Sequence, residues 1–209
     1  YFVKKKTNIK KLFYATYSNS KKAISYSLKH KVLLYMLLAI FFISFSIGVG
    51  NIIWQPFLKN IGLEVYKFGY MYSILGVIGV CVPFLTKYLL RRIGKEKTYL
   101  SLVNIFTTLI LLSIYFVVSP FMAIVVICLY NVFIDLEQPV YQTYFQRFAP
   151  SKIRATVGSF RSMVSCVGFA VATIIAGIMA DHIGLKMTLV YSAFFIIPAI
   201  IFYSKIKEK

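Results

Sequence analysis

Acidic residues and histidines are scarce in this chain. Its 209 residues include six Asp and Glu against 24 Lys and Arg, and only two His. It contains no glycine-rich phosphate loop, no nucleophile elbow and no spaced set of metal ligands. The three cysteines, Cys81, Cys128 and Cys166, stand in separate apolar runs without a CxxC or Cys/His spacing. These absences argue against an enzyme, a metal site, a bound cofactor and an ATP-driven mechanism.

Long apolar runs dominate what is present. Hydrophobic residues make up 59% of the chain and charged residues 14%, whereas soluble domains have about half and about a quarter. Windows of about 19 residues predict spans near residues 32–57, 68–90, 98–118, 121–148, 155–180 and 185–203, separated by turns with Gly, Pro or charge. The sequence therefore predicts an all-α membrane protein: a six-transmembrane-helix bundle over 32–205, a basic cytoplasmic arm over 1–31 and a cytoplasmic tail over 206–209.

The basic residues gather at one end of the predicted bundle. Residues 1–31, 87–97 and 147–161 and the tail after Tyr203 hold all Lys and Arg except Lys59, Lys67 and Lys186. By the positive-inside rule, both termini of this segment are expected in the cytoplasm, and the protein is expected to be multi-pass in the plasma membrane. The net charge of +18 then favours contact of the arm with anionic lipid over nucleic-acid binding. The first residue is not Met, so we expect a missing N-terminal part.

Three stretches resemble the C-terminal six-helix half of a major facilitator superfamily transporter, over residues from about 10 to the end. They are the turn LRRIGKEK, the stretch from Pro139 to Arg154 that leads into RATVGSF, and GIMADHIG. In the turn, Arg92, Gly94 and Lys95 match the family's D-R-x-G-R-K pattern at the cytoplasmic gate, whereas Arg91 and Lys87 replace its acid and first Gly. Similarly, Gln146 stands where an acid often precedes the Arg of RAT.

The resemblance implies two six-helix halves with inverted three-helix repeats and a small-molecule site between them. The partner of this chain would be a missing N-terminal six-helix half. The resemblance further implies that the first and fourth spans line the cavity, whereas the third and sixth face lipid.

The fourth span carries a polar stripe at helical spacing. Its members are Asn131, Asp135, Gln138, Gln142 and Gln146, and beside them we place Tyr130, Glu137, Tyr141 and Tyr144. A charge at the bilayer centre costs about 2.5 to 3.5 kcal/mol even on the lenient scale. This face is therefore expected to border protein or water.

Three readings of the two carboxylates remain open. Desolvation favours the neutral form of a carboxyl group, which would let one bind and release a proton, with Glu137 favoured for this role and Asp135 for staying charged. Alternatively, the acids attract a cationic substrate beside tyrosine rings such as Tyr141. In the third reading, Glu137 forms a structural ion pair with Arg161. In the first span, Asn51 and Gln55 share a face and could bond a substrate or a neighbouring helix.

The resulting hypothesis is a secondary active transporter of a small molecule, working by alternating access. Proton coupling is expected, and export of a drug-like or lipophilic compound is slightly favoured over uptake. The alternative is a non-transporting membrane sensor or assembly module on the same scaffold. Both hypotheses predict the topology, but only transport predicts that the polar face of the fourth span is wet.

Overall fold

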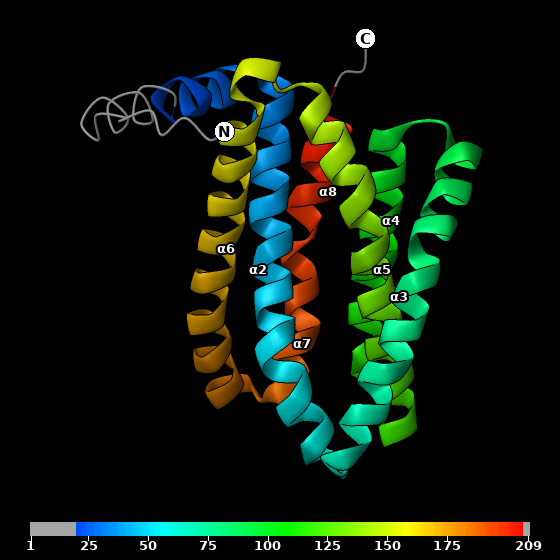
Figure 1. The fold of residues 1–209 in the computed structure, drawn as a ribbon. Coiled ribbons are helices and arrows are strands. Elements are labelled where there is room, and N and C mark those ends of the chain that lie inside the picture. The colour runs from blue at the N-terminus through cyan, green and yellow to red at the C-terminus, as the bar shows by residue number, and fades with distance from the viewer. Residues whose placement is uncertain (1–19, 207–209) are drawn as a thin grey trace, which may run out of the picture.

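The computed structural model describes residues 20–206. Most of the predicted arm and the end of the tail lie outside these residues. Residues 20–29 are helical and lie across one end of the bundle (Figure 1). The described part of the chain forms helices and no strands.

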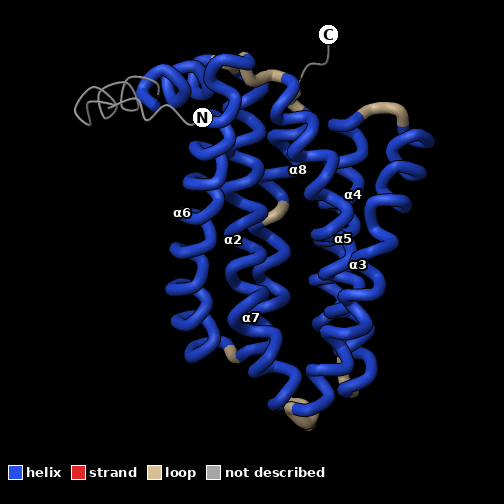
Figure 2. The backbone as a smooth tube through the Cα atoms, in the orientation of Figure 1, coloured by secondary structure: helices blue, strands red, loops and turns tan. Residues whose placement is uncertain are grey.

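Within residues 20–206, six helical segments are long and apolar enough to cross a membrane. The helices are α2 (Lys31–Asn60), α3 (Tyr66–Ile93), α4 (Glu96–Ser113), α5 (Pro120–Arg147), α6 (Arg154–Ile183), α7 (Leu185–Ser192) and α8 (Ile197–Ser204), with 3-10 turns η1 (Ile114–Phe116), η2 (Ser151–Ile153) and η3 (Ala193–Phe195). The prediction of an all-α, six-span bundle is confirmed. Figure 2 shows short connections at both ends.

Local chemistry explains where these helices begin and end. The backbone of Gly94 has φ 77°, a left-handed conformation that glycine adopts readily, and its N–H donates to the carbonyl of Leu90 at 2.8 Å to close α3. Pro120 opens α5, and the Ser119 hydroxyl accepts the N–H of Met122 at 3.3 Å. The turns at Gly94 and Ser119 therefore carry their own stop and start signals.

The last crossing is not the single helix that the sequence predicted over 185–203. It consists of α7, the 3-10 turn η3 and α8, and Figure 2 shows the interruption partway along the span. Pro198, in the first turn of α8, has no N–H to donate to the carbonyl four residues earlier. The missing hydrogen bond accounts for an interruption that a hydropathy window does not register.

The crossings form two groups. Helices α3, α4 and α5 pack together, α2 packs against α6, α7 and α8, and α4 and α8 connect the groups. Figure 1 shows the two groups side by side. Contacts between α2 and α5 are sparse. Much of the surface of each of these two helices is therefore not covered by the other.

Candidate functional site

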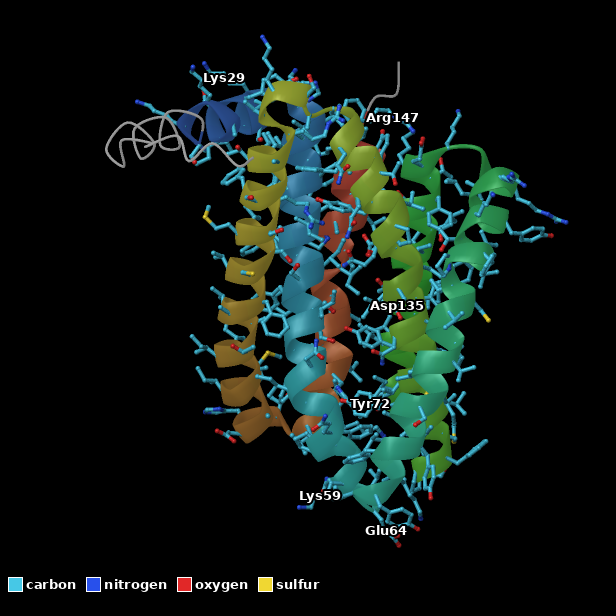
Figure 3. All side chains as sticks on the ribbon, viewed as in Figure 1. Lys29, Lys59, Glu64, Tyr72, Asp135 and Arg147 are labelled. Atoms are coloured by element: carbon cyan, nitrogen blue, oxygen red, sulfur yellow. The ribbon has the colours of Figure 1, made fainter. Side chains whose placement is uncertain are left out.

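The polar stripe of α5 is left uncovered by the bundle. Asp135, Gln142 and Gln146 are exposed, and Asn131 and Gln138 are half-buried. The Asn131 amide donates to the carbonyl of Ile127 at 2.8 Å, which leaves its side-chain oxygen available as an acceptor. Figure 3 shows Asp135 about halfway between the two ends of the bundle. A carboxylate at that depth requires protein or water on its open side.

Pro139 adds a polar backbone group at the same place. Because proline has no N–H, it cannot donate to the carbonyl of Asp135 four residues earlier on α5. This helix therefore offers both a carboxylate and a backbone carbonyl that lacks its usual helical partner.

The first span also exposes polar side chains. Asn51 and Gln55 of α2 are exposed. The Gln55 amide donates to the Tyr72 hydroxyl of α3 at 2.9 Å, and the Asn51 amide donates to the carbonyl of Ile47 at 3.1 Å. Gln55 thus makes a bond between helices, one of the two roles expected for it, and Asn51 keeps its side-chain oxygen open.

Glu137, in contrast, is sealed inside the bundle. Only 6% of its surface is exposed, and one carboxyl oxygen accepts the Tyr203 hydroxyl of α8 at 2.8 Å. The Asn104 side chain of α4 is a further polar neighbour of Glu137. Glu137 therefore joins α4, α5 and α8, which contradicts the expectation that it lines the polar face beside Asp135.

The angular arithmetic of a helix explains this difference. A step of two residues rotates a side chain by about 200°, since each residue advances about 100° around the axis. Asp135 and Glu137 must therefore point to nearly opposite sides of α5. Placing Glu137 beside the stripe was an error of projection.

Arg161 does not pair with Glu137. Its guanidinium lies over the Tyr141 ring, 5.8 Å from the centroid, and donates to the Ser162 hydroxyl at 3.4 Å. Among residues 20–206, the ion pairs are Lys67–Glu64 at 3.7 Å and Arg147–Glu96 at 2.5 Å. The structural role considered for Glu137 is thus met by a tyrosine hydroxyl instead of an arginine.

The tyrosines of α5 are also inside the bundle. Tyr141 and Tyr144 are each 1% exposed and Tyr130 is 7% exposed. The Tyr141 hydroxyl donates to the carbonyl of Met36 in α2 at 2.9 Å. The expectation that these rings offer their faces to a substrate is therefore contradicted by their burial within this chain alone.

The predicted gate turn is ordered by a different set of contacts. Arg92 lies over the Tyr88 ring at 5.2 Å, Gly94 takes the left-handed conformation, and Lys95 occupies the N-cap of α4. Next to it, Glu96 pairs with Arg147 at the end of α5. No local sequence pattern predicts this pair, because its members are 51 residues apart.

No group of three or more His, Cys, Asp or Glu side chains that could hold a metal ion occurs within residues 20–206.

The fold and the polar face together define a polytopic α-helical membrane protein with an uncovered hydrophilic surface. The family model described as Major Facilitator Superfamily matches residues 4–173. The chain belongs to this superfamily, as its sequence resemblance predicted.

A curated relative in Bacillus subtilis (strain 168), described as the uncharacterized MFS-type transporter YxaM, is 27% identical over 187 residues. The alignment covers 86% of this chain and 46% of the relative. The chain therefore spans about half the length of that relative. No solved structure gives a significant match.

Proposed function

We propose that this chain is the C-terminal half of a secondary active transporter that moves a small molecule by alternating access. The observation that carries the proposal is the uncovered stripe of α5, with Asp135 and Gln142 exposed in a helix that is otherwise apolar enough to cross a membrane. Such a surface is unstable against acyl chains and is suited to a water-filled cavity.

A second six-helix half would cover this surface. The family's halves enclose a site near the midplane, and the chain spans 46% of its curated relative. The polar sides of α2 and α5 are the surfaces that this half would meet. Both helices carry exposed side-chain amides, and α5 also carries Asp135.

Asp135 is the proton-binding group in this proposal. Asp135 faces the proposed cavity. Water would therefore reach its carboxyl group in one access state and be withdrawn from it in the other. Glu137 was the expected proton carrier, but its bond to Tyr203 and its burial fit a role in holding three helices together. Proton coupling through Asp135 requires no metal or nucleotide.

The distribution of charge supports an orientation in the membrane. The basic ends of α3, α5 and α6 lie together with residues 20–31, whereas Lys59 and Glu64 lie at the opposite end (Figure 3). The positive-inside rule places the basic end in the cytoplasm. The plasma membrane is the location that we propose for the protein.

Export of a lipophilic or cationic compound was expected from aromatic content and from acids in the cavity. Tyr141 and Tyr144 are buried in the bundle, whereas Asp135 is exposed. The proposal is therefore proton-coupled transport of a small polar or charged molecule.

Accessibility to a water-soluble thiol reagent tests the proposed cavity. The three native cysteines are first replaced, because Cys81 and Cys166 are exposed, and single cysteines are placed at Gln138, Gln142 and Leu136. We expect labelling in membranes at 138 and 142 but not at 136, which is buried. Protection at all three positions would instead support a non-transporting module.

Uptake into proteoliposomes with an imposed pH gradient tests the proton-binding group. Wild type is compared with Asp135→Asn and Glu137→Gln, using radiolabelled organic acids, amino acids and cations as trial substrates. We expect Asp135→Asn to remove gradient-driven uptake and Glu137→Gln to retain it in whatever fraction of the protein folds. The opposite pattern would return the proton to Glu137.

A further inference from the structure

An open pocket of about 770 Å³ lies between the cytoplasmic ends of α5 and α6. Two arginines line it, Arg154 and Arg161, and no acidic side chain does. The hydroxyls of Ser151, Ser159 and Ser162 line the same space. The side-chain amides of Gln142 and Gln146 complete its polar wall. The site named above for proton binding does not include these arginines.

Arg161 is held in place without being neutralised. It lies seven residues, about two turns, inside α6, and no ion pair involves it among the described residues. Its guanidinium stacks over the Tyr141 ring, which is anchored by its hydroxyl to the Met36 carbonyl at 2.9 Å. An arginine inside a membrane span without a carboxylate partner marks a functional site.

The donors in the pocket outnumber the acceptors that they meet. A guanidinium has five N–H donors in a rigid fork, and Arg161 uses one contact, to the Ser162 hydroxyl. Arg154 donates through Nε to the carbonyl of Ala149 at 3.3 Å, which leaves its two terminal nitrogens available. Planar, charge-assisted donors of this kind match the oxygens of phosphate and carboxylate groups.

We propose that the pocket between α5 and α6 binds the phosphate or carboxylate group of an anionic ligand through Arg161 and Arg154. Serine hydroxyls supply further hydrogen bonds. The source of the group is either a free organic anion that the protein carries or the head group of an anionic lipid. If the ligand is a free organic anion, this inference rests on the proposed function and names the substrate class as anionic.

The stripe of α5 links this pocket to the proton site. Gln142 lines the pocket and lies seven residues, about two turns or 10 Å, from Asp135 on the same face. Arginines at the cytoplasmic mouth and a carboxylate further in would let an anion and a proton occupy separate places on one surface. A negative ligand at the Asp135 position itself would be repelled while that carboxylate is ionised.

Binding measured on the purified chain in neutral detergent tests the site with two probes. Inorganic phosphate is titrated by calorimetry at constant ionic strength, and adducts of dioleoylphosphatidylglycerol are compared with dioleoylphosphatidylcholine by native mass spectrometry. Arg161→Gln and Arg154→Gln are the test variants. Arg91→Gln is the control, because Arg91 is exposed at the same end of the bundle and does not line the pocket.

We expect each test variant to bind one of the probes roughly tenfold more weakly than wild type. The control variant should bind both probes as wild type does. Loss confined to phosphate assigns a free anion, and loss confined to phosphatidylglycerol assigns a lipid head group. Absence of binding by both probes, or equal weakening by Arg91→Gln, overturns the site and indicates diffuse attraction to a chain of net charge +18.

Two measures keep the outcome interpretable. Each variant is compared only at matched monodisperse elution, and Arg161→Lys keeps the charge while removing the planar fork, so partial binding is expected. The assay requires no transport. Binding without transport would refute the proposed function alone, whereas transport with unchanged binding in Arg161→Gln would refute this pocket alone.

Discussion

At the residue scale, two acids that are adjacent in the pattern have opposite surroundings. Asp135 is exposed on an uncovered face, and Glu137 is enclosed by α4, α5 and α8. Glu137 accepts a hydrogen bond from Tyr203. The sequence could not identify this partner, because it is 66 residues away. Its hydroxyl is buried and would have no partner if the acid were absent.

Removal of that hydroxyl should destabilise the bundle. Tyr203→Phe leaves a carboxyl oxygen of Glu137 without its donor, and a buried polar group left unpaired costs about 1 to 3 kcal/mol. Thermal unfolding in detergent measures the effect. Tyr70→Phe is the control, since Tyr70 is 67% exposed, and its change should stay within about 0.5 kcal/mol. Equal melting temperatures for the two variants would contradict a structural role for the bond.

The helical period of the sequence could predict the exposed position of Asp135 but not the enclosed position of Glu137. The stripe from Asn131 to Gln146 follows the helical period, so Asp135 could be assigned to it from the sequence. The environment of Glu137 depends on which helices pack against the other side of α5, and one sequence without contacts does not contain that information. The pair Glu96–Arg147 was missed for the same reason, because only the fold brings the start of α4 to the end of α5.

At the element scale, α2 and α6 pack closely against each other. A Cβ added to Gly168 would lie 2.6 Å from the carbonyl oxygen of Phe41, and one added to Gly48 would lie 2.8 Å from the Cβ of Ala172. The hydroxyls of Ser44 and Ser165 meet across the same contact at 2.6 Å. Small residues therefore permit this approach.

A methyl group at this contact should force the two helices apart. Gly168→Ala is expected to cost about 1 to 3 kcal/mol, because the clashing atom is backbone and cannot rotate away. Gly177→Ala on the same helix is the control, since nothing lies within 4 Å of its added Cβ, and it should be neutral or stabilise α6 by up to about 1 kcal/mol. Similar melting temperatures for both variants would show that α2 and α6 are not packed as described.

At the scale of the whole molecule, the number of crossings could be predicted because lipid admits only long apolar helices with internally satisfied backbones. The interruption of the last crossing at η3 could not, because its residues remain apolar. Charge shows the complementary pattern. In the part of the chain that the structure describes, basic side chains mark one end of the bundle, and Lys59, Lys67 and Lys186 are the Lys and Arg residues of the other end.

This asymmetry gives the last prediction, the orientation in the membrane. Single cysteines replace Lys59, which is exposed in the last turn of α2, and Lys152, which is exposed between α5 and α6, in a background without Cys81, Cys128 and Cys166. A membrane-impermeant thiol reagent on intact cells should label position 59 and reach position 152 only after permeabilisation. The charge bias orients the bundle in this way because positive loops are retained in the cytoplasm. Labelling of 152 alone in intact cells would invert the topology, and the pocket of Arg154 and Arg161 would then open to the outside.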